Sequence, residues 1–545
     1  MVFLLPLLLA SVAVAAASPS PTVQLGKTSV HGVKVPSFEL DSFAGIPFAE
    51  PPVGPLRLKR SVLKTSPGGA TFNASASGLP CLQPIGLPLE EMSEDCLTID
   101  VLRPSGTTPG ANLPVMFWTY GGGFNLGFTS MFNATELVTL SVKRGTPVIY
   151  VVFNYRLGSL GFPQGQEADS KGALNLAIRD QLTALEWVQL NIGAFGGDKS
   201  KVTVFGESAG SIMTSILFLN SPITKLARAA IFESGSQASL PLVPAEARED
   251  HWQDFVAGVP SCASLATSSS TFECLQNATT EEIWTGLSAA NAASTAEFTW
   301  APVIDGPGGL IPDLPSVLFE RGQFARLPFI AGTNWDEGTL FTYNRVVNTT
   351  EQLVAKYIDL NSPSVSPQRL NASMEVVLKL YPDDPALGSP YNTGNETFGL
   401  GPEYKRDSAI IGDMFMLSQR RFWMAAAAKE GVQTYAYMFN ESQPNVDPLL
   451  GIAHASEIYS VYGTPFNTSP EGLALSRAMT DYWVSFATSL TPNDGLGVQR
   501  PEWTQWTPQN QELIMLEGGN VRMVADDFHL EQTEYFNSDP VIWRH

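Results

Sequence analysis

The sequence predicts an α/β protein with a mostly parallel sheet, and two observations support this prediction. Short apolar runs typical of buried strands alternate along the chain with segments of helical periodicity. Between two of these runs, apolar residues recur at spacings of three and four, which predicts an amphipathic helix over 174–192. Strands that alternate with helices form a parallel sheet covered on both faces. The expected strands are 115–119, 148–154, 202–205, 229–232, 329–332, 435–439 and 513–516.

The composition excludes several classes of protein. With 44% apolar and 10% aromatic residues, the 545-residue chain has ample core material and is not disordered. Its 32 Lys+Arg against 53 Asp+Glu give a net charge of −21, which repels nucleic acid. No HExxH motif or histidine cluster points to a metal, and no cofactor is implied. The Ala/Ser/Thr-rich stretch 261–295 is expected to be an insertion rather than a domain boundary.

The first 17 residues are expected to be a signal peptide cleaved before Ser18. The apolar run there ends in three alanines and is short for a membrane span, although no Lys or Arg precedes it, and a signal anchor is the alternative. No later stretch approaches 18 consecutive apolar residues, so no integral membrane span is expected. Asn-x-Ser/Thr sequons also favour a secreted, extracellular glycoprotein. They lie at Asn73, Asn133, Asn277, Asn348, Asn371, Asn395, Asn440 and Asn467, the last weakened by Pro470.

Four cysteines fit the same oxidising compartment. Neither Cys81 and Cys96 nor Cys262 and Cys274 form a CxxC motif, and no His-rich spacing accompanies them, so zinc is a poor interpretation. Four cysteines allow three pairings. Bridges between nearest neighbours, which close two short loops, are the economical choice.

A candidate nucleophile lies where a predicted strand meets a predicted helix. The strand 202–205 runs into Gly206-Glu-Ser-Ala-Gly210, and 211–219 has helical character. Strand, GxSxG and helix is the context of a nucleophile elbow, which holds Ser208 in a strained turn with its Oγ exposed. Side chains at 206 and 210 would collide with neighbouring backbone. The alternative is a merely structural turn, and Glu207 is expected to be a wall residue.

Candidate oxyanion donors follow the predicted strand 115–119. Three glycines in succession, within 120–124, free backbone N–H groups to face a ligand, as acyl transfer requires. A flexible loop is one alternative, and a phosphate loop another, but the spacing fits neither GxGxxG nor a Walker motif. Together with the nearby GxSxG, the run favours Gly122, Gly123 and Ala209 as the three N–H donors.

These motifs resemble the type-B carboxylesterase/lipase family, which includes secreted fungal lipases and cholinesterases. The resemblance implies a single α/β-hydrolase domain over 18–545 and pairing of Cys81 with Cys96. It also implies an activity on small-molecule esters. The matching segments occur in the family's order at 43–54, 93–101, 120–124, 154–162, 195–198 and 204–211.

Elimination among the five histidines leaves two candidates for the catalytic base. An α/β-hydrolase orders its triad as Ser, acid and His, so the base must follow Ser208 by some distance. His31, His251 and His545 do not fit, which leaves His454 and His529. The segment 453–458 resembles the family's histidine loop and favours His454; for His529 the alternative is a surface position beside Asp526 and Asp527.

The acid is expected in the loop 333–339, at the carboxyl end of the predicted strand 329–332. Either Asp336 or Glu337 could reach an imidazole from there. The family pattern places the acid at the Glu of Asp-Glu-Gly, which favours Glu337. Asp305 is expected to belong to a structural turn.

The predicted reaction is ester hydrolysis through an acyl-enzyme on Ser208. The negative charge favours neutral, largely apolar esters, and the scaffold suits short-acyl, lipid, sterol and feruloyl esters, with choline esters less favoured. The rival interpretation is a non-catalytic, cholinesterase-like adhesion protein on the same fold.

The loop 81–96 departs from the lipase pattern. It is too short for a lid of two helical turns, and Pro84 and Pro88 oppose a helix. We therefore expect an accessible site with little interfacial activation. An apolar rim remains possible, built from Leu82, Ile85, Leu87, Leu89 and Met92.

Overall fold

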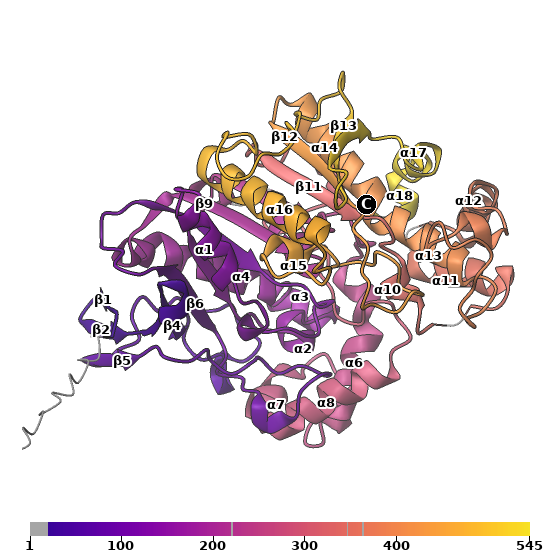
Figure 1. Ribbon diagram of the computed structural model, residues 1–545. Coiled ribbons are helices and arrows are strands. Elements are labelled where there is room, and N and C mark those ends of the chain that lie inside the picture. Colours follow the sequence, from indigo (N-terminus) through magenta and orange to yellow (C-terminus); the bar gives the residue numbers. More distant parts are fainter. Residues whose placement is uncertain (1–19, 220–221, 346, 362–364) are drawn as a thin grey trace, which may run out of the picture.

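The computed structural model describes residues 20–219, 222–345, 347–361 and 365–545 (Figure 1). The signal peptide predicted at 1–17 lies outside this part of the chain. None of the helices in the described part is long and apolar enough to cross a membrane.

A mixed sheet of eleven strands forms the centre of the molecule. Strands β8, β7, β9, β10, β11, β12 and β13 pair in parallel, whereas β14 at one edge and β6, β4 and β3 at the other are antiparallel. In spatial order the strands are β14 (Arg522–Ala525), β13 (Glu512–Leu516), β12 (Thr434–Phe439), β11 (Phe329–Asn334), β10 (Ala229–Glu233), β9 (Gly197–Glu207), β7 (Leu113–Thr119), β8 (Ile149–Phe153), β6 (Thr98–Pro104), β4 (Leu40–Pro47) and β3 (Val33–Val35).

All seven strands expected from the sequence are present in the parallel part of this sheet, which confirms the predicted fold class. The predicted amphipathic helix is α4, and the helix expected after Ser208 is α5. The helices are α1 (Thr135–Lys143), α2 (Gly158–Gly161), α3 (Gly165–Ser170), α4 (Leu176–Asn191), α5 (Ala209–Ile216), α6 (Glu249–Gly258), α7 (Phe272–Asn277), α8 (Thr280–Ala293), α9 (Pro315–Glu320), α10 (Thr339–Thr342), α11 (Thr350–Asn361), α12 (Pro367–Leu380), α13 (Tyr404–Gly412), α14 (Ser418–Lys429), α15 (Ile458–Val461), α16 (Pro470–Ser489), α17 (Leu530–Ser538) and α18 (Pro540–Trp543).

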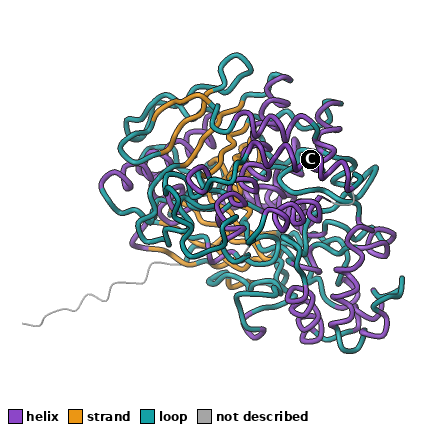
Figure 2. The backbone as a smooth tube through the Cα atoms, turned by 90° about the vertical axis from the view of Figure 1, so that its right-hand side faces the viewer, coloured by secondary structure: helices purple, strands orange, loops and turns teal. Residues whose placement is uncertain are grey.

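Helices cover both faces of the sheet, as two neighbouring residues of β7 show. Successive side chains of a strand point to opposite faces. Trp118 packs edge-on against Tyr462, directly after α15, with ring centroids 5.5 Å apart. Thr119 accepts a hydrogen bond of 2.9 Å from Gln181 of α4. In the view turned by 90°, the strands form a twisted band, and a group of helices extends beyond it at the lower right (Figure 2).

The stretch 261–295 forms α7 and α8, and α8 packs against α6. Its buried side chains, among them Leu275, Ile283 and Leu287, belong to the same hydrophobic core as the sheet. A separate small sheet near the N-terminal end of the described chain contains β1 (Thr22–Leu25), β2 (Thr28–His31) and β5 (Thr71–Asn73).

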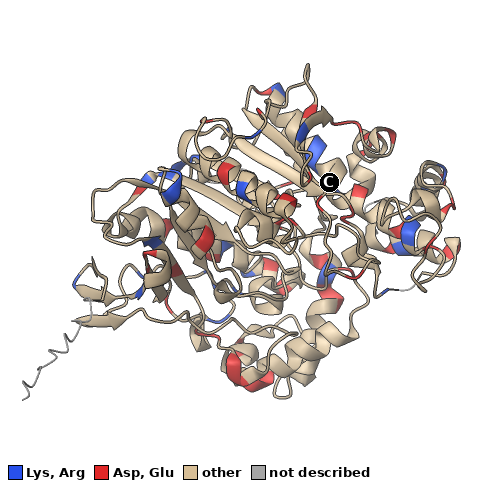
Figure 3. Ribbon diagram, in the orientation of Figure 1, with Lys and Arg blue, Asp and Glu red and all other residues tan. Residues whose placement is uncertain are grey.

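The nearest-neighbour disulfides are confirmed. Cys81 pairs with Cys96 and Cys262 with Cys274, with Cα atoms 5.0 and 5.8 Å apart. Acidic and basic residues are interspersed over the ribbon rather than divided between two halves of the molecule (Figure 3).

Candidate active site

Ser208 lies at the sharp turn between β9 and α5, in a backbone conformation that residues other than glycine rarely adopt. Its φ is 55° and its ψ is −128°. The glycines on either side permit this turn, as predicted: a Cβ at Gly206 would lie 2.7 Å from the carbonyl oxygen of Thr119, and one at Gly210 would overlap the same group. The Ser208 N–H donates to the Glu233 carbonyl at 2.9 Å, which ties the turn to β10. Such strain at a half-buried serine between a strand and a helix is typical of a nucleophile elbow.

Three backbone N–H groups around this turn are free. In the part of the chain that the structure describes, the N–H groups of Gly122, Gly123 and Ala209 donate to no protein acceptor. Gly122 and Gly123 adopt φ values of 105° and 59°, which turn the chain so that Asn125 and Leu126 bond back to the Gly122 carbonyl. Unpaired N–H groups beside a strained serine are what an oxyanion requires.

Gly121 also matters, although the sequence did not single it out from the two glycines that follow. A Cβ at this position would stand 2.7 Å from Oε2 of Glu207 and 2.8 Å from Cβ of Ser208. The serine and the glutamate therefore lie against the same point of the glycine loop, and only glycine fits between them.

His454 and Glu337 are in direct contact. Nδ1 of His454 lies 2.6 Å from Oε2 of Glu337, and both side chains are buried. The ring of Phe341 packs against the imidazole with centroids 5.0 Å apart. A carboxylate at Nδ1 holds the proton there and leaves Nε2 to act as the acceptor.

Nε2 of His454 faces Glu207, the residue before Ser208. The two atoms Nε2 and Oε1 are 3.2 Å apart, but without the alignment of a hydrogen bond. Burial lowers the pKa of His454, while the carboxylates of Glu207 and Glu337 outweigh burial and raise the pKa to about 9. Burial raises the pKa of Glu207 in turn, opposed by His454. Glu207, expected to be a wall residue, thus lies directly against the imidazole of His454.

A second layer of polar groups holds Glu337. Its Oε1 accepts hydrogen bonds from Ser234 Oγ at 2.6 Å and from the Asn334 N–H at 2.7 Å. Asn334 also donates to Glu457 at 2.7 Å, and burial raises the pKa of Glu457 to about 7. Sequence reasoning missed these residues, because Ser234 follows β10, Asn334 ends β11 and Glu457 precedes α15, and only the folded chain brings the three together.

The other residues considered for the acid and the base lie outside the contact between His454 and Glu337. Asp336 accepts hydrogen bonds from Ser389 Oγ and the Tyr391 N–H, both at 2.8 Å, and does not contact His454 through its side chain. His529, expected at the surface, is half-buried: its Nδ1 lies 2.6 Å from Asp413, and its ring stacks on Phe528. The pKa of the buried His545 is lowered by burial to about 3.

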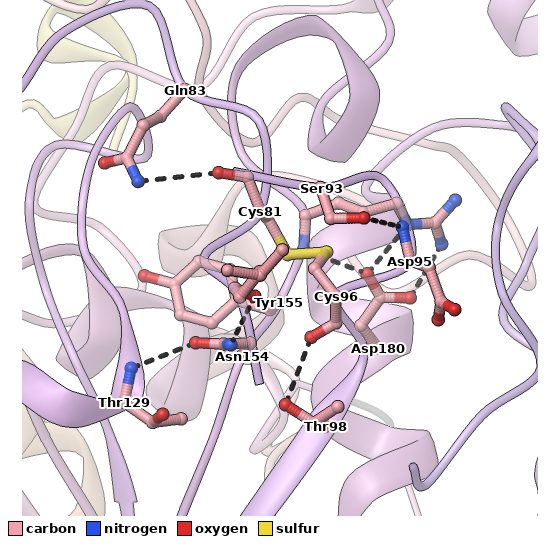
Figure 4. Close-up of a disulfide and its surroundings, with 12 residues drawn as sticks. Cys81, Gln83, Ser93, Asp95, Cys96, Thr98, Thr129, Asn154, Tyr155 and Asp180 are labelled. Carbon is pink, nitrogen blue, oxygen red and sulfur yellow. Dashed lines mark hydrogen bonds and ion pairs between the residues drawn. A yellow bond between two sulfur atoms is a disulfide. The ribbon is translucent and has the colours of Figure 1, made fainter. Parts of the chain in front are cut away.

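Figure 4 shows the disulfide between Cys81 and Cys96 that closes the loop 81–96, with Gln83 of the same loop bonded to Cys81. Gln83 Nε2 donates to the Cys81 carbonyl, and its Oε1 accepts from the Gly127 N–H at 3.0 Å. Of the five residues expected to form an apolar rim, Leu82 and Met92 are buried, Leu87 and Leu89 are half-buried, and Ile85 is exposed.

The sheet order and the serine at its elbow define an α/β-hydrolase. The model of the carboxylesterase family matches residues 19–535, and the chain belongs to this family and is a carboxylic ester hydrolase. It is 35% identical to "Secreted triacylglycerol lipase LIP1" of Gibberella zeae, over 96% of this chain and 92% of that one. It is 32% identical to "Lipase 4" of Diutina rugosa, over 96% of each. The crystal structure of Aspergillus niger EstA superposes with a TM-score of 0.83 at 26% identity, covering 97% of this chain and 99% of EstA.

Proposed function

We propose that Ser208, His454 and Glu337 form the catalytic triad of a secreted serine esterase. The observation that carries this proposal is the state of His454: Nδ1 is bound to the buried Glu337 carboxylate, while Nε2 has no hydrogen-bond partner in the described chain. This is the arrangement of a general base that waits for a hydroxyl proton. The preference for Glu337 over Asp336 rests on the same contact.

The reaction proceeds in two halves. His454 Nε2 takes the proton of the Ser208 hydroxyl as Oγ attacks the ester carbonyl, and a tetrahedral oxyanion forms. The imidazolium then gives its proton to the leaving alcohol as the ester C–O bond breaks. Water, activated by the same histidine, releases the acid and restores the serine.

The oxyanion is stabilised by the free N–H groups of Gly122, Gly123 and Ala209. Each of these donors contributes on the order of 3 kcal/mol to the transition state, because it is pre-aligned and shielded from water. Ala209 also begins α5, so the positive end of that helix faces the developing charge.

Aromatic side chains beside the site favour esters with an apolar acyl group. Phe298, Phe341 and Phe415 surround one another with centroids 6.1 to 6.2 Å apart, and Phe341 touches the imidazole of His454. The names of the relatives, several of them secreted lipases, support a neutral lipid ester among the substrates. Nothing in these comparisons supports the non-catalytic adhesion alternative.

Secretion and N-glycosylation complete the proposal. The names of the fungal relatives include the word secreted, in agreement with the predicted signal peptide. Asn440 and Asn467 are half-buried, and Asn467 bonds to Glu441, so they are poor acceptors. The exposed sequons that we propose as glycan sites are Asn73, Asn133, Asn277, Asn348, Asn371 and Asn395.

Replacement of Ser208 tests the proposal. Ser208→Ala is expected to lower kcat on a p-nitrophenyl ester by about 10⁶-fold, as loss of a triad nucleophile does. Ser215→Ala is the matched control, because this serine lies in α5, the helix that follows Ser208, and its hydroxyl donates to the Ile212 carbonyl. An organophosphate should label the wild type and the control but not Ser208→Ala. Activity of Ser208→Ala within tenfold of the control would refute the assignment.

A further inference from the structure

A cavity of about 620 Å³ lies between the segment that follows β10 and helix α11. Phe298 lines this cavity and also packs beside residues of the proposed catalytic centre. Its ring is 3.7 Å from the place where a Cβ on Gly123 would stand, and its centroid is 6.1 Å from that of Phe341, the ring that touches His454. The cavity is therefore one side chain away from the proposed oxyanion site.

Each cationic side chain in the wall of the cavity has an acidic neighbour. Arg345 lies 3.4 Å from Glu297, and Lys356 lies 2.8 Å from Asp407. The third cation, Arg248, shares the cavity with Asp359. An ionised carboxylate would meet Glu297 and Asp359, and a cationic ligand would meet Arg248, so a neutral ligand is favoured.

Several of these groups have hydrogen-bonding capacity to spare. Oε2 of Glu297 is buried and accepts no hydrogen bond from the described residues, although it lies 3.4 Å from Nη1 of Arg345. Arg248 donates through Nη1 to the Phe298 carbonyl at 3.0 Å, and its other guanidinium nitrogens bond to nothing in the described chain. Hydrogen-bond donors of Arg248 and an acceptor of Glu297 that are not used within the described chain therefore line the same cavity.

We propose that this cavity binds the hydroxylated alcohol of the ester substrate, so that sugar and polyol esters are preferred. A hydroxyl both donates and accepts, and it can satisfy Glu297 and Arg248 at once without adding charge. The apolar acyl chain does not belong among these charged groups, which assigns the cavity to the alcohol. The inference rests on the proposed function for its chemistry: Oγ of Ser208 displaces the sugar from the acyl carbon, the sugar oxygen leaves with a proton from His454, and water then hydrolyses the acyl-enzyme.

Paired esters of one acid test the preference. Glucose 6-octanoate and methyl octanoate carry the same acyl chain and differ only in the alcohol. We expect kcat/KM to be at least tenfold higher for the glucose ester, mainly through a lower KM. Equal values for the two esters, or a preference for the methyl ester, would overturn the inference.

Two variants locate the effect in the cavity. Arg248→Met and Glu297→Leu are each expected to lower kcat/KM on the glucose ester about tenfold, and to leave the methyl ester within twofold. Arg326→Met is the matched control, because Arg326 pairs with Glu430 on the exposed surface. A loss on both esters alike would show a structural defect and contradict the assignment.

Binding of octyl β-glucoside separates this inference from the proposed function. Below its micelle concentration, calorimetry should show binding to wild type and to Ser208→Ala, and at least tenfold weaker binding to Arg248→Met. If the glucoside binds in this way while neither ester is cleaved, the proposed function fails and the cavity assignment stands. If the wild type hydrolyses esters but Arg248→Met binds the glucoside as tightly as wild type, the cavity assignment fails alone.

Discussion

Glu337 and His454 are 117 residues apart in the chain, yet their side chains meet at 2.6 Å. The neighbours of these two residues explain the contact. Asp336 pairs with Ala453 in a short parallel bridge, and Asp336 also accepts a hydrogen bond of 3.0 Å from the Ile452 N–H. The loop after β11 and the loop after β12 are thus joined through Asp336, which places the next residue of each loop face to face. One carboxylate holds the loops and the other holds the imidazole.

This division of roles predicts opposite results for two neighbouring substitutions. Glu337→Gln keeps the shape of the side chain but removes the charge that orients His454, so kcat should fall by about 10⁴-fold. Asp336→Asn should lower stability by about 1–3 kcal/mol, because an amide cannot accept all of the bonds that Asp336 accepts. Its kcat per folded molecule should stay within about tenfold of wild type.

Steady-state kinetics together with thermal unfolding distinguish the two variants. The assignment of Glu337 would be lost if Glu337→Gln kept most of its activity while Asp336→Asn, at a temperature where it is folded, did not.

Local pattern accounts for what could be predicted of this site. The strands were recognisable as apolar runs, and Ser208 was recognisable because GxSxG depends on residues adjacent in sequence. The choice between Asp336 and Glu337 was not local. Both lie in one loop, and which of them reaches His454 depends on the bridge between two loops that are far apart in the chain.

Contacts between separate elements could not be predicted from the sequence either, because they too depend on residues that are far apart in the chain. Ser234, directly after β10, donates a hydrogen bond to Glu337, and nothing near Ser234 in the sequence marks it as part of the site. His529 was expected on the surface because acidic residues precede it, but it pairs with Asp413, from a distant helical segment, and is only partly exposed. Charge patterns predict exposure poorly when the partner is remote.

Gly121→Ala tests whether the glycine loop must touch the nucleophile. The added Cβ would stand 2.8 Å from Cβ of Ser208 and 2.7 Å from Glu207, so either the serine or the loop must move. Because a shift of about 1 Å at a catalytic centre costs about 10²-fold, we expect at least that loss in kcat. Gly193→Ala is the control, since a Cβ there meets nothing within 4 Å and the backbone is not left-handed. Comparable kinetics for the two variants would contradict the prediction.

The charge of Glu207 should set the pH dependence of the reaction. A base must be neutral, and the carboxylates of Glu207 and Glu337 raise the pKa of His454 to about 9 against the opposing effect of burial. The kcat/KM of wild type should therefore rise as the pH increases towards 9. Glu207→Gln removes one of these charges, so the midpoint of the rise should move to lower pH. The control is Glu186→Gln on the exposed side of α4, which should leave the midpoint unchanged.

The same pKa has a consequence for stability. A charged His454 stabilises the folded state fully below pH 6.5, and this contribution is lost as the pH rises through about 9. Glu207→Gln should weaken that pH-dependent part of the unfolding free energy. A midpoint of activity that stays in place or moves upward in Glu207→Gln would refute the role of Glu207.

A buried ion cluster far from the serine should matter for stability alone. Asp526 accepts hydrogen bonds from Arg420 at 2.6 and 2.8 Å and from Arg421 at 3.0 Å. Burial alone would raise the pKa of Asp526, but the two guanidinium groups hold it well below its ordinary value. Asp526→Asn leaves both arginines without their counter-charge and should cost about 3–5 kcal/mol of unfolding free energy.

The exposed pair Arg326–Glu430 provides the comparison for that cluster. Its side chains are 53% and 36% exposed, so Glu430→Gln should cost less than about 1 kcal/mol. Denaturant unfolding at pH 7 measures both losses. Since the pKa of Asp526 is depressed, its contribution should persist at pH 4.5 and disappear only at lower pH. Equal losses for the two variants would contradict the account of the buried cluster.

The contacts that anchor the loop 81–96 predict how the enzyme responds to an oil–water interface. A lid that opens at an interface needs an apolar face that is hidden in water, but here Leu82 and Met92 are already in the core, and Gln83 holds the glycine loop through Gly127. The rate should follow simple saturation as tributyrin crosses its solubility limit, with no abrupt rise. Ile85→Ser, which changes the exposed apolar residue of the loop, should alter the rate by less than about twofold on either side of that limit. A steep increase above the limit that Ile85→Ser abolishes would show that the loop moves and acts as a lid.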